Sequence, residues 1–188
     1  MSGGRTKPRT MPRLLPRLRT LRRDRKAATI IEFAAIAAPF IALILASIQT
    51  SLVFFAQQCL ETTSEETSRE LITGAAQKSG MDQADFDKLA CKNLPSFMGC
   101  ANLMVDVQTA DSFADVDTST PELTYDSKGN VKKNWQFHTG EPGSIIVMRT
   151  MYILPVIGGP LGFDLSNMEG NRRLLVATAV FKSEPYSS

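Results

Sequence analysis

Histidine is nearly absent from this sequence, since His138 is the only one among 188 residues. The chain also lacks a Gly-rich phosphate loop, a nucleophile elbow and ligand pairs at metal-binding spacing, which argues against phosphate-transfer, hydrolase and metal-dependent classes. His138 lies in QFHTG beside a predicted turn, a setting more typical of a solvent-facing imidazole than of a catalytic base. We therefore expect a protein that is not an enzyme and that holds no cofactor and no metal ion.

Cysteine is also scarce, with three residues in the whole chain, Cys59, Cys91 and Cys100. A zinc site would need further ligands that the sequence does not offer at suitable spacing. Cys91 and Cys100 enclose the short loop CKNLPSFMGC, and in a segment outside the cytoplasm we expect them to form a disulfide worth roughly 2–3 kcal/mol. Cys59 follows a helical apolar pattern and is interpreted as a small buried residue.

Charge is missing from a long internal run, because Glu32 is the only charged residue between positions 27 and 56. As a helix rising about 1.5 Å per residue, this run would extend about 45 Å, more than the hydrocarbon core of a bilayer at about 30 Å. We therefore predict a transmembrane helix over residues 27–56. A removed signal peptide is the alternative, but the run is too long and no typical cleavage site follows it.

Basic residues concentrate immediately before this run. Residues 1–26 contain ten Lys or Arg residues against Asp24, a net +9, whereas residues 57–188 carry −6 and the whole chain +2. This asymmetry places the 1–26 tail in the cytoplasm and exports residues 57–188. A nucleic-acid-binding arm is the alternative for the tail. Its position beside an apolar span favours the lipid bilayer as partner, and we expect no nucleic acid.

A helical pattern continues past the membrane segment. One face is formed by residues at spacings of three and four, namely Ala56, Leu60, Thr63, Thr67 and Leu71, opposite Glu61, Glu65 and Ser68. The pattern predicts one helix from about 27 to 73, with Gly74 as its cap. Pro39 removes a backbone donor inside it, which predicts a kink or a loosened turn. Asp82 is typical of the N-cap of a second, short helix that Pro95 ends.

Three later runs are typical of β-strands: LMVDVQT (103–109), SIIVMRTMYIL (144–154) and RLLVATAVFK (173–182). In the first, Leu103, Val105 and Val107 alternate with Met104, Asp106 and Gln108, as in a half-buried strand. In the last, Leu175, Ala177, Ala179 and Phe181 share a face that can lie against a helix. The polar stretches between these runs contain Gly, Pro, Asn and Asp and are predicted loops.

The predicted fold class is therefore α+β. A long N-terminal transmembrane helix continues into a small periplasmic domain with a short second helix and an antiparallel sheet of about three to four strands. Its parts are the tail (1–26), the span (27–56) and the domain (57–188). Four aspartates could in principle bind calcium through their carboxylate oxygens. They lack the Gly and the terminal Glu of a calcium-binding loop, which favours a solvated acidic loop. The four are Asp106, Asp111, Asp115 and Asp117.

Glu32 needs an explanation, because a carboxylate costs roughly 2.5–3.5 kcal/mol at the centre of a membrane helix. One interpretation is that it meets a positive partner when helices assemble, so that both charges leave water as a pair. The other is that Glu32 lies near the inner interface within reach of Lys26 or Arg25 and is merely an anchor.

The segment RDRKAATIIEF and the apolar helix after it resemble the prepilin leader of type IV pilins and, more closely, the TadE/TadG-like proteins of the tight-adherence (Flp) pilus system. The later blocks CANLMVDVQT, WQFHTGEPGSIIVMRTMYILP and GNRRLLVATAVFKSEPY resemble the same family. In that family a prepilin peptidase cuts five residues before the glutamate. The resemblance thus implies processing between Ala27 and Ala28, with Ala27 in the place where these peptidases favour Gly.

The resemblance implies a pseudopilin-like (minor pilin) protein required for assembly of tight-adherence pili, with Glu32 acting in helix assembly. Its partners would be other pilin-like subunits, Tad assembly proteins and a prepilin peptidase. It would reside in the bacterial inner membrane as a single-pass protein with an exported C-terminal domain. A membrane-anchored periplasmic binding or sensor domain, with the helix as a tether only, is the alternative; an anchored enzyme is a third class that the scarcity of catalytic residues argues against.

Overall fold

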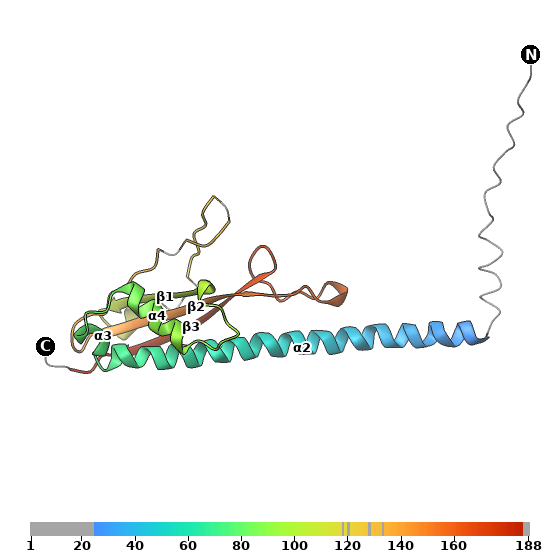
Figure 1. Ribbon diagram of the computed structural model, residues 1–188, viewed down its shortest axis with the longest axis horizontal. Helices are drawn as coiled ribbons and strands as arrows, with labels where there is room; N and C mark the ends of the chain where they lie inside the picture. The colour runs from blue at the N-terminus through green and yellow to red at the C-terminus, as the bar shows by residue number, and fades with distance from the viewer. Residues whose placement is uncertain (1–24, 118, 120, 128, 133, 186–188) are drawn as a thin grey trace, which may run out of the picture. The chain divides into compact units, whose positions relative to one another are not determined.

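The computed structural model describes residues 25–117, 119, 121–127, 129–132 and 134–185 (Figure 1). The predicted basic tail therefore lies outside the described residues up to position 24. The described residues form two units, one up to Leu45 and one from Ala46 onward. In the described residues, the first unit consists of helix and the second holds the whole sheet.

Helix α2 (Arg25–Ile72) is the longest element and runs through Pro39 without interruption. It begins two residues before the predicted start and ends one residue before the predicted end. Gly74 terminates it as expected: its φ is 70°, a left-handed conformation that glycine adopts without steric cost, and its N–H donates to the carbonyl of Leu71 at 3.3 Å.

Two shorter helices follow, α3 (Ala75–Lys78) and α4 (Gln83–Asn93). The predicted cap of α4 is present, since the Asp82 carboxylate accepts from the Asp85 backbone N–H at 2.8 Å. The helix ends two residues before Pro95, whose ring disfavours a helical conformation in the residue before it.

Strands β1 (Leu103–Ala110), β2 (Ile145–Pro155) and β3 (Arg172–Lys182) form one antiparallel sheet in the order β1-β2-β3. Three short 3-10 turns lie between these elements, η1 (Cys100–Asn102), η2 (Phe113–Asp115) and η3 (Pro160–Gly162). The α+β prediction and the number of strands are confirmed.

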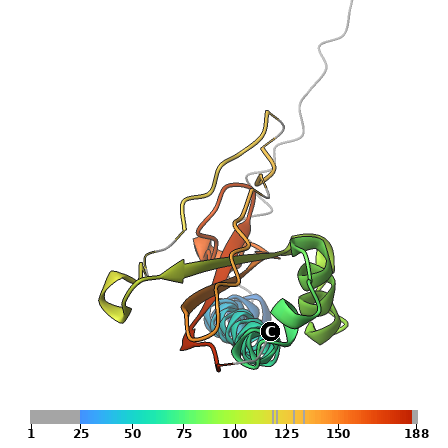
Figure 2. The same cartoon turned by 90° about the vertical axis from the view of Figure 1, so that its left-hand side faces the viewer.

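One face of the sheet packs on the part of α2 that belongs to the second unit and on α4, as Figure 2 shows from the end of the helix. The predicted helix face is buried there, with Leu60 and Leu71 fully enclosed. Leu175 and Ala177 of β3 face the same core, as predicted. Buried hydroxyls complete the contact, because Thr150 of β2 donates to Ser64 at 3.2 Å and Asn93 of α4 donates to Thr67 at 3.2 Å.

The opposite face of the sheet is covered as well, which corrects the prediction of a half-buried first strand. Met104 packs with Met151 and Leu174 in a second cluster, which the loop residues Leu123 and Trp135 flank. Alternation along a strand reports the side to which each residue points, and a covering loop can bury both sides. Ser68, expected on the exposed helix face, is also buried, and its hydroxyl donates to the carbonyl of Glu65 at 2.8 Å.

Candidate functional site: the apolar segment of helix α2 and Glu32

The N-terminal part of α2 presents apolar side chains outward. Phe33 is 72% exposed and Ile36 73%, and the pattern continues along the helix through Ile30, Ile31, Phe40, Ile41, Leu43, Ile44 and Leu45. Such a continuous apolar surface on a soluble helix would be costly, at about 25 cal/mol per Å². In the part of the chain that the structure describes, one helix is long and apolar enough to cross a membrane.

Glu32 lies on this exposed surface, in the second turn of α2. Ala28 precedes it by four residues, and residues at this spacing are neighbours on one face of a helix, with Cβ atoms about 5–6 Å apart. An α-amino group at residue 28 would therefore lie one turn from the Glu32 carboxylate. Ala27 also lies within the helix.

Cys91 and Cys100 form a disulfide, with their Cα atoms 5.4 Å apart. The bridge links the last turn of α4 to the start of η1 and so closes the loop that leads into β1. Cys59 is the free cysteine; it is half-buried and packs against the main core, as a small apolar residue would.

An ion pair in the middle of the sheet has no counterpart among the predicted site residues. Arg149 of β2 lies directly opposite Asp106 of β1 in the strand register, with 3.9 Å between Nη1 and Oδ2. Both side chains are buried, and Asp106 also accepts from the backbone N–H of Gln136 at 2.9 Å and the amide of Gln108 at 2.8 Å. Asp106 is thus a structural anchor, which corrects its assignment to a solvated acidic loop.

Arg149 also ties the β1–β2 loop to the sheet. Its Nη2 lies 3.4 Å from Asp117 Oδ2 and donates to the Asp117 backbone carbonyl. Hydrogen bonds from Ser119 are the main cause that lowers the pKa of Asp117, with a smaller contribution from the Arg149 charge. The sequence held one signal for this arrangement, an Arg within an apolar strand and an Asp within another, since a buried charge requires a partner.

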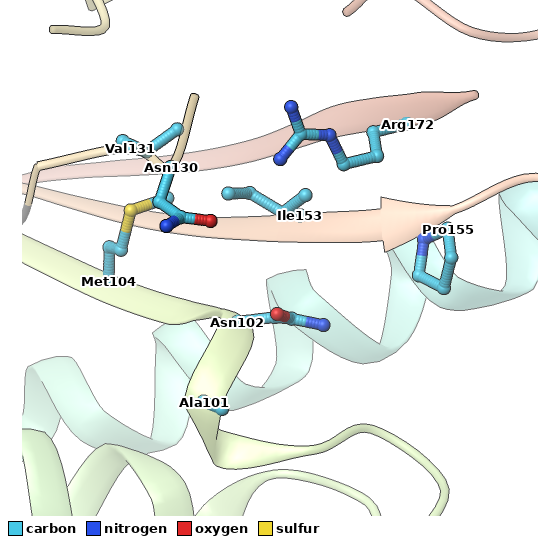
Figure 3. A pocket seen from close by; sticks show the side chains of 8 residues that line it. All are labelled: Ala101, Asn102, Met104, Asn130, Val131, Ile153, Pro155 and Arg172. Atoms are coloured by element: carbon cyan, nitrogen blue, oxygen red, sulfur yellow. The ribbon is translucent and has the colours of Figure 1, made fainter. Parts of the chain in front are cut away.

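In the described part of the chain, the β1–β2 loop and the sheet line two open hollows on the face away from α2. Figure 3 shows one of about 310 Å³, where Asn130 and Val131 of the loop face Ile153 of β2 and Arg172 of β3. Arg172 is the one ionisable residue in its lining, and its guanidinium donates to the carbonyls of Glu169 and Gly129 at 3.0 and 3.4 Å. The contact with Gly129 ties the β1–β2 loop to β3, whereas Glu169 lies only three residues before Arg172.

The second hollow lies beside the ion pair and is lined by Arg149, Trp135 and Asp117, among others. Arg149 Nε and Trp135 Nε1 are buried there without a hydrogen-bond acceptor among the described residues. His138 is exposed, as predicted, and its backbone N–H donates to the carbonyl of Val107 at 2.8 Å. Across the residues that the structure describes, no cluster of three His, Cys, Asp or Glu residues could hold a metal ion.

Comparison with known proteins adds one finding. Residues 27–69 match the family model described as TadE-like protein. Neither the curated proteins nor the solved structures give a match. The matched segment begins at Ala27, contains Glu32 and ends near the end of α2, and the blocks from CANLMVDVQT onward lie outside it. The resemblance stated from the sequence is confirmed over these residues, where the N-terminal helix of this chain matches the TadE-like family model.

Proposed function

We propose that this protein is a pseudopilin-like component of tight-adherence pilus assembly, anchored in the inner membrane through α2 with its second unit exported. The observation that carries the proposal is the coincidence of three features in one segment. Glu32 and the outward-facing apolar surface lie within the first two-thirds of α2, and the TadE-like match covers both before it continues to residue 69.

The proposed work of α2 is to pack with the helices of pilin-like subunits. Small residues along the membrane segment permit the close backbone approach on which helix association in lipid depends. They are Ala34, Ala35, Ala37, Ala38, Ala42, Ala46 and Ser47. A buried carboxylate favours a neighbour that brings a positive charge, because two opposite charges then leave water together.

Two positive groups fit this role. The first is the terminal amine that a prepilin peptidase would create at Ala28, on the same chain or on an adjacent subunit. The second is a basic side chain of another assembly component. In either case Glu32 sets the depth and register of α2 relative to neighbouring helices. The second unit determines which proteins are contacted outside the membrane.

The test is the replacement Glu32→Gln in a strain whose own gene is deleted, with pili counted by electron microscopy. We expect the variant to restore few or no pili although it accumulates in the membrane, because an amide cannot neutralise a positive partner. Glu66→Gln is the matched control, since Glu66 lies exposed on the same helix outside the apolar run. Normal pili with Glu32→Gln would reject the proposed role of the carboxylate.

A second candidate function is that of an anchored binding domain. It is favoured by the buried donors of Arg149 and Trp135, which line a hollow and have no acceptor in the described residues. In that case α2 is only a tether, and replacing Glu32 by Gln leaves the activity intact. The same experiment therefore separates the two functions.

A further inference from the structure

The loop between β2 and β3 carries exposed apolar side chains at its tip. Residues 155–163, PVIGGPLGF, contain no charge. Ile157 is 83% exposed and Leu161 88% exposed, more than any other large hydrophobic residue outside α2. Leu161 adopts a left-handed φ of 58°, a conformation that few residues other than Gly adopt. We call residues 156–163 the β2–β3 tip.

This tip lies against α2 at a defined position. The side-chain amide of Gln49 donates to the carbonyl of Ile157 at 3.2 Å. Gly159 lies so close that a Cβ at this position would be 2.8 Å from Gln49 Oε1 and from the Phe163 carbonyl. These contacts place the tip beside the turn of α2 that contains Gln49.

The level of Gln49 relative to a bilayer follows from helix length. A helix needs about 20 residues to cross the hydrocarbon core. A span that begins at Ala28, directly after the basic residues, ends at about Ser47 and leaves Gln49 in the adjoining headgroup layer. Any later start, or any tilt of the helix, moves Gln49 deeper. The tip thus reaches at least the membrane interface in every such placement.

The surface beside the tip is apolar too. A groove of about 400 Å³ between the helix and the loop is lined by Leu52, Phe55, Phe97 and Ile157, among others. Phe55 and Phe97 stack with their ring centroids 5.6 Å apart, although both remain more than half exposed. Apolar surface that lies exposed at the level of a bilayer interface gains free energy by entering it.

We propose that the β2–β3 tip is a second membrane contact. Ile157 and Leu161 insert at the headgroup–acyl boundary of the leaflet that faces the exported side. The partner is lipid, because the Gln49 contact holds the tip at the level of the bilayer and its apolar side chains carry no charge to be desolvated. The inference rests on the membrane placement in the proposed function, not on the role of Glu32. The contact would hold the globular unit in one orientation on the membrane.

The test uses the full-length chain in phosphatidylcholine vesicles at few copies per vesicle. Ile157→Trp adds a reporter at the tip, and the emission of the unsubstituted chain, whose single tryptophan is Trp135, is subtracted. Phe113→Trp is the matched control, since Phe113 is exposed and follows the end of β1 that pairs with Ile145, at the opposite end of β2 from the tip. We expect lipids brominated on the upper acyl chain to remove most of the added emission of the tip reporter and little of that of the control.

Equal quenching of both reporters, or quenching of neither, would overturn the proposal. A blue-shifted tip reporter that bromine does not quench would also overturn it, because a protein surface would then cover the tip. Leu161→Trp provides a second reporter if Ile157→Trp does not fold. Flotation of the same vesicles distinguishes the failures: an unquenched chain that floats rejects the tip contact alone, whereas a chain that does not float also rejects the membrane placement of the proposed function.

Discussion

Two charged residues, Glu32 and Arg149, occupy apolar surroundings in different ways. Arg149 lies within a strand and meets Asp106 directly across the sheet, with Asp117 behind it. Its charge is matched within the chain, so it contributes to the fold. Glu32 lies on the outward surface of a helix that suits lipid. In the proposed membrane placement, its charge is available for a partner outside the chain.

The first prediction concerns cleavage of the peptide bond between Ala27 and Ala28. If the leader-like segment is processed, coexpression with a cognate prepilin peptidase will produce a chain that begins at Ala28. The new amine would lie one helical turn from Glu32 and stabilise its carboxylate. Intact-mass measurement of membrane-extracted protein checks the result.

Ala27→Gly is the control for this measurement, because it supplies the residue that these peptidases favour and should make cleavage more complete. Full-length chain alone, for both the natural sequence and Ala27→Gly, would exclude processing at this site.

Among the elements, α2 combines two surfaces of different character. Over its first two-thirds the apolar side chains point outward, whereas from Ala56 onward an apolar and hydroxyl face packs on the sheet and the charged residues point to solvent. The change follows from composition, since no charged residue occurs between Glu32 and Glu61. One helix can therefore serve as a membrane segment in its first part and pack against the sheet of a folded domain in its last part.

Alanine substitutions at Leu60 and Leu52 test this difference between the packed and the exposed surface of α2. Leu60 is fully buried between helix and sheet, so Leu60→Ala should lower the free energy of unfolding by about 2–5 kcal/mol through lost contacts and a cavity. Leu52→Ala, on the same helix but 61% exposed, should change it little. Thermal unfolding in detergent, followed by circular dichroism of the sheet signal, gives the comparison. Similar losses for the two variants would contradict the packing described for α2.

For the whole molecule, the distribution of charge and the disulfide both support the orientation proposed above. The basic residues lie before the apolar run and the acidic excess after it, and the disulfide belongs to the acidic part. Disulfides persist in oxidising compartments such as the bacterial periplasm. The export of the second unit that we propose would account for both features.

Counting thiols tests this orientation. Protein extracted from membranes and denatured without reductant should take up one alkyl group, at Cys59, because Cys91 and Cys100 are bridged. After reduction it should take up three, as mass spectrometry would record. Three groups before reduction would contradict both the bridge in the cell and export of the unit that holds it.

The sequence by itself determined the elements whose signals are local. The uncharged run from 27 to 56 and the periodicity that follows it predicted one long helix, Asp82 and Pro95 bounded α4, and three β-rich runs became three strands. Glu32 was singled out from local pattern, and Ala27 and Ala28 from the resemblance of the flanking segment to a prepilin leader. Neither step needs knowledge of the fold, and the roles of these residues stay predictions.

Tertiary structure alone decided what depends on contacts between distant segments. Asp106 appeared solvated until the register placed it opposite Arg149, and Met104 appeared exposed until the β1–β2 loop covered it. The position of Ile157 beside Gln49 joins residues 108 apart in sequence, so no periodicity could indicate it. Periodicity reports which way a side chain points relative to its own element, whereas burial depends on what the rest of the chain places there.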